Sequence, residues 1–235
     1  MAHALTILIP AYNEERTIKQ LLALVEKMDV SRAGLSKEII VIDDGSTDNT
    51  RRFIRETQQQ FPDIILLHHE RNQGKGAAIK TVLSRATGDI IIIQDADLEL
   101  DPQDILRCVQ PILDGKAVVV YGSRRLQKQK TRANMLYLIG GIMVTKFFNL
   151  LYHQHLTDIP TCYKAFRADI LKRITIEGNR FEWEPEVSAK VTKMGISITE
   201  VPISYYPRTA KEGKKLRWKD GLYALWTLLK YRVKT

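Results

Sequence analysis

Residues 89–99 read DIIIIQDADLE. The first half, Asp89–Ile93, is a short and continuous apolar run, which is the pattern of a strand buried on both faces of a parallel sheet. Carboxylates follow this run at once, and ligands of such sheets bind at the carboxyl ends of the strands. The stretch therefore predicts both an element of the fold and a candidate site.

More runs of this kind occur in the first half of the chain, with helical patterns between them. The other expected strands are Leu5–Ile9, Glu38–Ile42, Ile64–His68 and Ala117–Tyr121. The expected helices are Thr17–Met28, Thr50–Gln60, Gly76–Ala86 and a helix through Leu113 with its N-cap at Asp101. Strands and helices that alternate predict an α/β fold with a mostly parallel, Rossmann-like sheet covered by helices.

The composition is that of a folded globular protein. Of the 235 residues, 44% are hydrophobic and 27% are charged, which excludes a disordered chain. The two cysteines, Cys108 and Cys162, form no C-x-x-C pair, so a disulfide scaffold and a cysteine zinc site are disfavoured. The first residues lack a signal-peptide pattern, and the expected location is the cytoplasm.

The net charge of +9 is concentrated in the second half of the chain. Seven basic and no acidic residues lie between Lys116 and Thr157, and nine basic but two acidic residues lie between Tyr205 and Thr235. These stretches predict an anionic partner, such as a phosphate, a membrane headgroup or a nucleic acid. Nucleic acid is the weakest of these, because no nucleic-acid motif is present and aromatic residues do not interleave the basic loop.

Met135–Tyr152 is a mostly apolar helical segment that directly follows the basic loop. It contains Lys146 and Asn149 and is marginal for crossing a hydrocarbon core of ~30 Å. Two interpretations stay open: an amphipathic helix lying in a membrane interface, or an internal core helix. The second apolar segment, Leu222–Tyr231, is shorter still.

Asp95 and Asp97 stand two residues apart at the end of an expected strand, with Glu99 next in line. Carboxylates this close need a cation, and Mg²⁺ or Mn²⁺ binds a few carboxylates together with substrate phosphate oxygens. The pattern thus suggests a metal bound to a diphosphate. Taken alone, an acidic loop that caps the next helix is the better interpretation.

Polar residues also follow the first two strands. Asp43 and Asp44 end the second strand, and we expect Asp43 to be structural and Asp44 to face a ligand, although a turn explains both. After the first strand, Tyr12 would stack on a base and Glu14 would bond to it, or Glu14 simply begins a helix. The loop NQGKG at 72–76 lacks the third glycine of a dinucleotide site, and its glycines predict a tight turn.

Four motifs in this order resemble the inverting family 2 glycosyltransferases of the GT-A fold: IPAYNEE, IDDGSTDNT, NQGKGAA and QDADLE. In the second half, GSRR, TDIPTCYKAFR, FEWEPE and VPISYYPRTAKEGKK resemble the polyprenyl-phosphate hexosyltransferases. That group includes the dolichyl-phosphate mannose synthases and the dolichyl-phosphate β-glucosyltransferases. The resemblance implies the GT-A fold for the chain, with amphipathic interface helices in the second half.

The resemblance also implies roles for individual residues. The nucleotide pocket would contain Pro10, Tyr12, Glu14, Ile42 and Asp44, with Asp95 and Ala96 near the ribose and base. Asp97 would bind Mg²⁺ or Mn²⁺ with Glu99 as a second ligand, a position where mannose synthases often carry glutamine. Arg124, Arg208 and Lys214 would hold the phosphates of donor and acceptor. A solvated basic face near lipid headgroups is expected for Arg125, Lys128, Lys130 and Lys211. Glu182, Glu184 and Glu186 either line the sugar pocket or begin a helix.

The expected activity is a metal-dependent, inverting transfer of a hexose from a nucleoside-diphosphate sugar of the GDP-mannose or UDP-glucose type. The acceptor would be a dolichyl or undecaprenyl phosphate, and the product would be β-linked. One domain, 1–235, would comprise a nucleotide-sugar-binding half, 1–121, and an acceptor-binding, membrane-facing half, 122–235. Such an enzyme would be peripheral on the cytoplasmic face of an anionic membrane. The alternatives are a family 2 glycosyltransferase with a soluble or cell-envelope saccharide acceptor, and a nucleotidyltransferase on a similar sheet.

Overall fold

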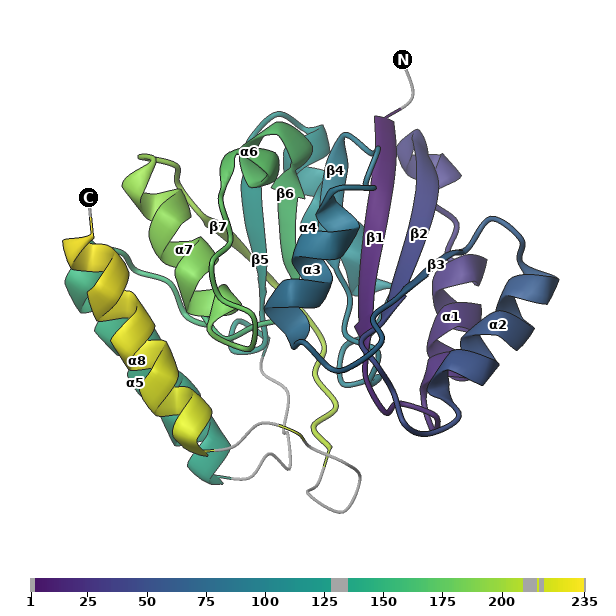
Figure 1. Ribbon diagram of the computed structural model, residues 1–235. Coiled ribbons are helices and arrows are strands. Elements are labelled where there is room, and N and C mark those ends of the chain that lie inside the picture. The colour runs from purple at the N-terminus through teal and green to yellow at the C-terminus, as the bar shows by residue number, and fades with distance from the viewer. Residues whose placement is uncertain (1–2, 128–134, 209–214, 216–217, 235) are drawn as a thin grey trace.

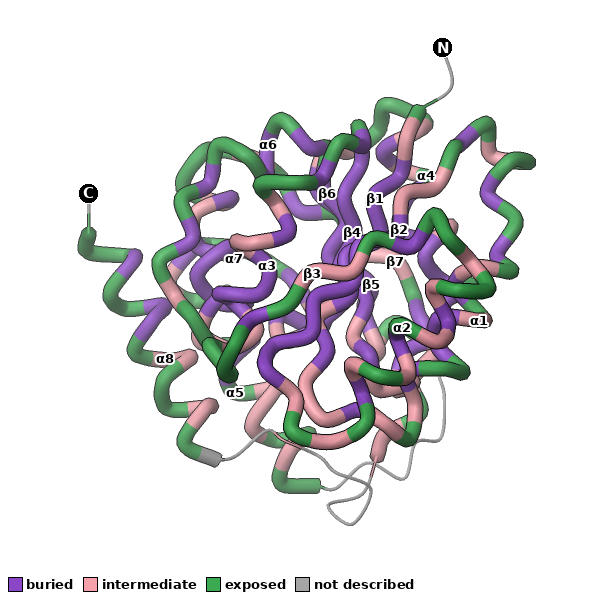
Figure 2. Tube along the Cα trace, turned by 45° about the vertical axis from the view of Figure 1, so that its right-hand side comes forward, coloured by how far each residue is buried: buried purple, intermediate pink, exposed green. Residues whose placement is uncertain are grey.

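The computed structural model describes residues 3–127, 135–208, 215 and 218–234. Their core is a seven-stranded sheet with the strand order β3-β2-β1-β4-β6-β5-β7 (Figure 1). The strands are β1 (His3–Ala11), β2 (Leu35–Asp43), β3 (Ile65–His68), β4 (Ile90–Ile93), β5 (Val119–Ser123), β6 (Lys164–Arg167) and β7 (Thr199–Pro202). All four isoleucines of β4 are buried, so the sheet is covered on both faces at its centre (Figure 2).

Helices connect and cover the strands, as the alternating pattern predicts. They are α1 (Ile18–Lys27), α2 (Thr50–Gln60), α3 (Lys75–Leu83), α4 (Asp104–Leu113), α5 (Met135–Tyr152), α6 (Ala168–Arg173), α7 (Trp183–Lys193) and α8 (Trp218–Val233), with a short 3₁₀ turn at Ser31–Ala33. Helix α4 begins three residues after the N-cap expected at Asp101. The Asp101 carboxylate instead accepts a hydrogen bond from the backbone N–H of Gln103 at 3.0 Å, inside a turn that precedes the helix.

The sheet is mixed in its second half. Strands β1 to β4 are parallel, and β5 is parallel to β7, but β6 runs antiparallel to both of its neighbours. Neither β6 nor β7 was expected, because each has only four residues and neither is a continuous apolar run. The mostly parallel α/β sheet is confirmed, and one reversed strand is added to it.

One edge of the sheet collects the loops that carry the motifs. The register pairs Ala11 at the end of β1 with Asp43 at the end of β2, and Ser123 at the end of β5 with Pro202 at the end of β7. Strand β4 ends at the same edge, which is the lower edge in Figure 1. Residues that follow these strands therefore come from distant parts of the sequence and lie at one end of the sheet.

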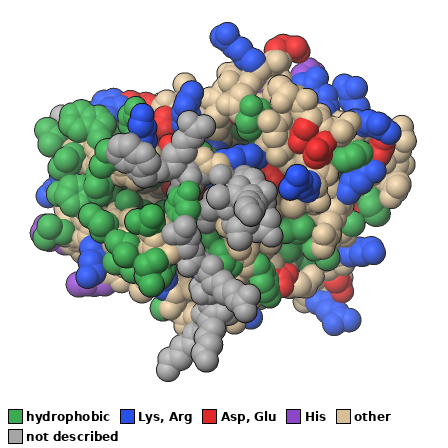
Figure 3. All heavy atoms as spheres, turned by 90° about the horizontal axis from the view of Figure 1, so that it is seen from below, with side chains coloured by type: hydrophobic (Ala, Val, Ile, Leu, Met, Phe, Trp, Pro, Cys, Tyr) green, Lys and Arg blue, Asp and Glu red, His purple; other side chains and the backbone are tan. Residues whose placement is uncertain are grey.

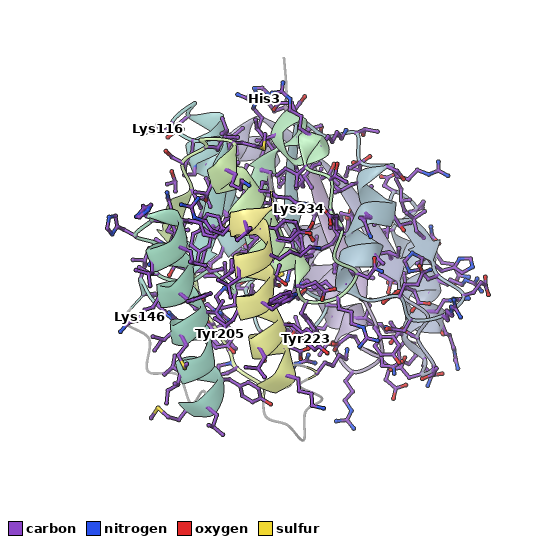
Figure 4. The ribbon with its side chains drawn as sticks, turned by 60° about the vertical axis from the view of Figure 1, so that its left-hand side comes forward. His3, Lys116, Lys146, Tyr205, Tyr223 and Lys234 are labelled. Atoms are coloured by element: carbon purple, nitrogen blue, oxygen red, sulfur yellow. The ribbon has the colours of Figure 1, made fainter. Side chains whose placement is uncertain are left out.

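Helices α5 and α8 lie side by side, away from the sheet (Figures 1 and 4). The Tyr152 hydroxyl donates to the Leu228 carbonyl at 2.8 Å, and the Tyr231 hydroxyl ties α8 to Glu186 of α7 at 3.0 Å. In the described part of the chain, α5 is the one helix whose length and composition suit a membrane crossing. Only 22% of it is buried, and the buried part contributes Val144, Phe148 and Tyr152 to the hydrophobic core, so α5 packs on the core with one face and exposes the rest.

Candidate active site

The loop after β4 and a segment after β7 meet at the lower edge of the sheet. Leu98, between Asp97 and Glu99, has a positive φ of 59°, and Asn13 in the loop after β1 has one of 49°. Side chains with a Cβ rarely adopt this left-handed conformation, and such strain is found preferentially at functional sites. Both strained residues lie in loops that carry sequence motifs.

Arg208 joins three acidic residues of this edge. Its guanidinium donates to Glu14 Oε2 at 2.9 Å and to Asp97 Oδ2 at 3.0 Å, and its backbone N–H donates to Glu99 Oε1 at 2.8 Å. The backbone of Tyr206 donates to the Glu99 carbonyl, which keeps the segment beside the loop. Lys215 adds a second cation to Glu14 at 2.5 Å. The C-terminal segment thus supplies positive charge to carboxylates from the N-terminal half.

The Nε atom of Arg208 is a buried donor without a hydrogen-bond partner in the described part of the chain. A buried N–H that lacks an acceptor costs free energy, and native proteins rarely tolerate one without a reason. An anionic ligand such as a phosphate would supply the missing acceptor. This atom fits the expected role of Arg208 in holding a phosphate.

Burial in the first place and the nearby Asp95 carboxylate in the second raise the pKa of Asp97 to about 7. Arg208 opposes the shift, because its positive charge favours the ionised form of Asp97. Burial is the larger cause of the raised pKa, and the excess of negative charge around Asp97 adds to it.

The excess can be counted from the described residues of the site. The carboxylates are Glu14, Asp95, Asp97, Glu99 and Glu184, and the cations are Lys75, Arg208 and Lys215. Five carboxylates against three cations leave two negative charges, which one divalent ion would neutralise. Asp97 and Glu99 offer the hard oxygen ligands that Mg²⁺ and Mn²⁺ prefer. The described residues hold no group of three side chains suited to a metal. Phosphate oxygens of a bound diphosphate are the usual further ligands of Mg²⁺.

Lys75, which the sequence interpretation left out, is a central residue of the site. Its ammonium lies 2.7 Å from Asp95 and 2.9 Å from Glu184 of α7. Burial by itself would lower the pKa of Lys75, but the surrounding negative charges, with Asp95 first and Glu184 among them, together outweigh burial and hold that pKa well above the ordinary value. The Lys75 side chain is 10% exposed and that of Asp95 is 28% exposed, so Lys75 stands behind Asp95 and leaves its outer side open.

The glycines around Lys75 serve a turn and a close approach, as the pattern predicts. Gly74 has a φ of +99°, and a Cβ at Gly74 or Gly76 would lie within 2.4 Å of the carbonyl oxygens of Asn179 or Gly178. This packing places the first turn of α3 against the loop before α7. Lys75 thereby reaches Glu184, which lies in the first turn of α7. The only signal for Lys75 in the sequence is its position between these two glycines.

Asp44 does not face the open edge, which corrects the orientation expected for it. Its carboxylate accepts the backbone N–H groups of Gln73 and Gly74 at 2.9 and 2.7 Å, and side-chain donors of His69 and Asn72 at 2.7 and 2.9 Å. These four donors saturate the carboxylate, so Asp44 anchors the glycine loop in place of a phosphate. A role of Asp44 in nucleotide binding stays a prediction. Asp43 is structural, as expected, and pairs with Arg51 at 2.7 Å.

The remaining nucleotide-pocket residues gather at the same edge. Pro10 pairs with Ile42 in the β1–β2 register, and the half-buried ring of Tyr12 lies beneath the ammonium of Lys215 at 5.7 Å. Ala96 is buried, and its carbonyl accepts the Thr17 hydroxyl at 2.7 Å. The fold thus brings these residues together, and their contact with a nucleotide stays a prediction.

Arg124 is held by a buried carboxylate that the sequence interpretation missed. Its guanidinium forms two bonds to Asp158, at 2.7 and 2.8 Å, and Asp158 is fully buried. Arg124 also lies 5.0 Å from the ring of Tyr205, whose side chain bonds to Glu99. Arg124 therefore contacts Tyr205, and Tyr205 connects it to Glu99 of the acidic cluster. The charge of Arg124 is neutralised by Asp158.

The other predicted residues divide into two groups. Glu182, Glu184 and Glu186 lie at the start of α7, as one interpretation predicts, and of these only Glu184 contacts the acidic cluster, through Lys75. Glu182 and Glu186 accept backbone N–H groups of the preceding loop. Lys214 and the basic residues Lys128, Lys130 and Lys211 lie outside the described residues.

Comparison with known proteins gives consistent matches. The family model described as Glycosyl transferase family 2 matches residues 6–175. A UDP-N-acetylglucosamine–dolichyl-phosphate N-acetylglucosaminyltransferase of Methanococcus voltae is 30% identical over 84% of this chain and 83% of its own length. A dolichyl-phosphate beta-glucosyltransferase of Trichomonas vaginalis is 25% identical over 86% of this chain, which spans only 65% of that relative.

The fold itself matches a solved enzyme. The crystal structure of glucosyl-3-phosphoglycerate synthase from Mycobacterium tuberculosis with Mn²⁺, UDP-glucose and phosphoglyceric acid superposes with a TM-score of 0.74. The match covers 98% of this chain and 80% of the synthase, at 18% identity. At that identity the likeness shows a shared fold and nothing finer.

Proposed function

The chain belongs to glycosyl transferase family 2, and on that premise we propose that it transfers a hexose from a nucleoside-diphosphate sugar to a polyprenyl phosphate. The donor would be of the GDP-mannose or UDP-glucose type, and the product would be β-linked. One observation carries the proposal: the acidic edge of the sheet adjoins two helices that expose apolar side chains. An enzyme that joins a charged sugar nucleotide to a lipid needs both surfaces close together.

The relatives support a lipid acceptor. The Methanococcus and Trichomonas proteins are both named for transfer to dolichyl phosphate. Because the chain spans only part of the second relative, the activity of that whole protein is carried over as a proposal only. The sugars in the two names differ, so the hexose follows from neither.

Donor binding would use the acidic edge. Asp97 and Glu99 would hold Mg²⁺ or Mn²⁺, which when bound neutralises the charge that develops on the leaving nucleoside diphosphate. Arg208 would turn its free Nε toward a phosphate oxygen, and Lys214 would assist. Asp95, oriented by Lys75, would lie beside the ribose and base.

The chemistry needs no strong general base. A phosphate oxygen of the acceptor attacks the anomeric carbon, and the bond from that carbon to the diphosphate oxygen breaks with inversion. The electron pair leaves with the diphosphate, and the acceptor is already an anion near neutral pH. The task of the protein is to hold two anionic phosphates in line at one carbon, for which Arg208 and Lys214 would supply positive charge. The phosphate role expected for Arg124 is weakened by its pairing with Asp158.

Helices α5 and α8 would lie on the membrane. Their exposed apolar side chains include Met135, Leu136, Ile139, Met143 and Leu150 of α5, and Leu222, Tyr223, Trp226, Leu229 and Val233 of α8. Figure 3, which looks at the lower edge of the sheet, has hydrophobic side chains gathered at the side of these helices. A contiguous apolar face of this kind commonly marks an interaction surface. We place the enzyme on the cytoplasmic face of a membrane, with 1–121 as its donor half and 122–235 as its acceptor half.

A soluble or cell-envelope acceptor is the second candidate. The structural neighbour is a glucosyl-3-phosphoglycerate synthase, solved with phosphoglyceric acid, and its fold covers nearly the whole of this chain. That acceptor is a small soluble phosphate. On this alternative, the apolar face of α5 and α8 would contact a protein partner instead of a bilayer.

A donor panel tests the proposal directly. The purified chain is given GDP-mannose, UDP-glucose, UDP-N-acetylglucosamine or UDP-galactose with Mn²⁺ or Mg²⁺, with and without a polyprenyl phosphate in vesicles. We expect one donor to give a glycolipid in the organic phase, identified by mass spectrometry. Consumption of a donor without any lipid product would support the glycosyltransferase activity and contradict the proposed lipid acceptor.

The membrane contribution has its own control. Trp226→Asp places a charge on the exposed apolar face of α8, and we expect it to lower both vesicle binding and glycolipid formation. Binding of nucleoside diphosphate with Mn²⁺ should stay at the wild-type value, because Trp226 lies on the solvent side of α8. Wild-type vesicle binding by this variant would argue against α8 as a membrane contact.

A further inference from the structure

Arg125 is a half-buried cation without an ion-pair partner among the described residues. Its Nη1 donates to the Thr157 carbonyl at 2.7 Å, and its backbone N–H donates to the Ser123 hydroxyl at 3.2 Å. Arg124, the preceding residue, is paired twice with the buried Asp158. Two adjacent arginines therefore differ in kind: one is neutralised inside the protein and the other is not.

Among the described residues no carboxylate forms an ion pair with Arg125, although the charges of Asp158 and Glu200 act on it from a greater distance. The sequence from Arg124 to Thr157 contains no Asp or Glu, and Asp158 is occupied by Arg124. Glu200 accepts the backbone N–H groups of Thr157 and Asp158 at 2.7 and 3.0 Å. Burial lowers the pKa of Arg125 from its ordinary value, as expected for a cation that is removed from water without full compensation.

Helix α5 makes room for this guanidinium. A Cβ on Gly141 would lie 3.0 Å from Arg125 Nη2 and 3.4 Å from Pro160 Cγ, whereas a Cβ on the neighbouring Gly140 would meet nothing within 4 Å. Glycine is a poor helix former, so its presence in the middle of α5 needs a reason. At 141 the missing side chain leaves room for the Arg125 guanidinium, and we call this position between Gly141 and Pro160 the guanidinium seat.

The seat lies at the boundary between polar and apolar surface. Leu138, Ile139 and Met143, within three residues of Gly141 on α5, are all exposed. On the other side, Arg125 is the second residue after β5, at the edge of the sheet that carries the acidic cluster. A ligand that fills this position needs an anionic group for the guanidinium and an apolar part for α5.

We propose that Arg125, seated against Gly141, binds the phosphate group of a lipid whose hydrocarbon chain lies along α5. The inference rests on the proposed function and changes one residue assignment in it. The lipid phosphate is bound by Arg125, and not by Arg124, whose charge is neutralised by Asp158. A guanidinium presents paired N–H donors that match phosphate oxygens. The phosphate belongs either to the polyprenyl phosphate acceptor or to an anionic headgroup of the surrounding membrane.

Vesicle binding and turnover distinguish these two sources. Arg125→Gln, Arg125→Lys and the wild type are sedimented with phosphatidylcholine vesicles that are plain, or that contain phosphatidylglycerol, or that contain a few per cent polyprenyl phosphate. Arg173→Gln is the matched control, because Arg173 is an exposed arginine of α6. We expect Arg125→Gln to bind phosphate-bearing vesicles about ten-fold more weakly than the control, with Arg125→Lys in between.

Each outcome bears on the inference. A loss confined to polyprenyl phosphate vesicles, with a raised KM for that acceptor, assigns the site to the acceptor. A loss on both kinds of anionic vesicle assigns it to lipid headgroups in general. Equal binding of Arg125→Gln and Arg173→Gln to every vesicle overturns the proposal. Gly141→Ala is a second route, because its Cβ would lie 3.0 Å from Arg125 Nη2 and would shift the guanidinium by a few tenths of an ångström, so we expect a smaller loss of binding in the same direction.

Failure of the inference can be told apart from failure of the proposed function. If the wild type makes a glycolipid and Arg125→Gln makes it with the same KM and the same vesicle binding, only the inference is wrong. If no donor yields a glycolipid while Arg125→Gln still loses vesicle binding, the proposed acceptor is wrong and the lipid-phosphate site stands. Binding of nucleoside diphosphate with Mn²⁺, measured by calorimetry, should be the same in all variants and shows that they are folded.

Discussion

Arg208 and Asp97 are 111 residues apart in the sequence, and in the fold their side chains form an ion pair of 3.0 Å. Asp97 is the residue to which the sequence assigns a divalent metal, and Arg208 is one to which it assigns a phosphate. In the protein without ligands, the guanidinium thus supplies part of the positive charge at the position expected for the metal. The strand that ends before Asp97 and the segment after β7 are brought together by this pair.

The pair gives a first prediction for catalysis. Asp97→Asn keeps the size of the side chain but removes a charged oxygen ligand, so we expect metal-dependent turnover to fall by about 10³-fold or more. Glycolipid formation with Mn²⁺ or Mg²⁺ is the measurement. Asp114→Asn, an exposed carboxylate paired with Lys116, serves as the control and should keep full activity. Wild-type turnover by Asp97→Asn would show that the metal assignment is wrong.

The raised pKa of Asp97 makes the stability of the protein dependent on pH. Between the ordinary value of 3.8 and about 7, the folded state binds more protons than the unfolded state. The contribution of Asp97 is therefore fully present below pH 4 and is lost as the pH rises through 7, with an upper limit of ~4 kcal/mol. Urea unfolding between pH 5 and 8 measures this contribution to the free energy of unfolding. In Asp97→Asn the free energy of unfolding should change less between these pH values. An unchanged pH dependence in that variant would contradict the shift.

Removal of Arg208 separates function from folding. Arg208→Ala leaves Glu14 and Asp97 without their shared guanidinium, and we expect kcat/KM to fall by about 100-fold or more. Glu14 keeps Lys215 as a partner, and Asp97 can take up a proton because its pKa is already raised, so the melting temperature should change by only a few degrees. Calorimetric scanning beside the activity assay checks both parts. A variant that is unfolded at room temperature, or one that is fully active, would refute this reading of Arg208.

Lys75 should control donor binding through Asp95. In Lys75→Met, Asp95 loses the ammonium that fixes its orientation at 2.7 Å, and we expect nucleoside diphosphate with Mn²⁺ to bind about ten-fold more weakly. Titration calorimetry with UDP and with GDP measures the effect, and Lys116→Met is the matched exposed control. Lys75→Met combined with Asp95→Asn should add little to either change alone, because the two residues act as a unit. Additive losses would show that Lys75 acts independently of Asp95.

The pair Arg124–Asp158 should matter for stability. Asp158→Asn leaves the half-buried Arg124 guanidinium without its countercharge, and breaking a buried pair costs about 3–5 kcal/mol. Urea unfolding at pH 7 measures this loss. Replacing both partners, with Arg124→Met and Asp158→Leu, should recover part of it, since no charge then remains unpaired. A loss below about 1 kcal/mol for Asp158→Asn would place the pair among the weak surface bridges.

Much of the donor half could be read from the sequence. The runs Leu5–Ile9 and Asp89–Ile93 become β1 and β4 with small changes at their ends, because a strand buried on both faces leaves a continuous apolar run. Tyr12, Glu14 and Asp97 fall at one edge because parallel strands bring their carboxyl ends together. Strands β6 and β7 could not be read, since four residues with a mixed pattern carry no period.

The sequence by itself determined which residue types stand after each strand, and the family motifs they form. Only the tertiary structure decided which charges meet. It turned Asp44 inward onto the glycine loop, placed Lys75 beside Asp95, and paired Arg124 with Asp158, whereas Arg125 has no ion pair within the described part of the chain. The physical reason is range. An apolar period is a property of neighbouring residues, whereas the pairing and burial of a charge depend on partners 20 to 111 residues away in the sequence.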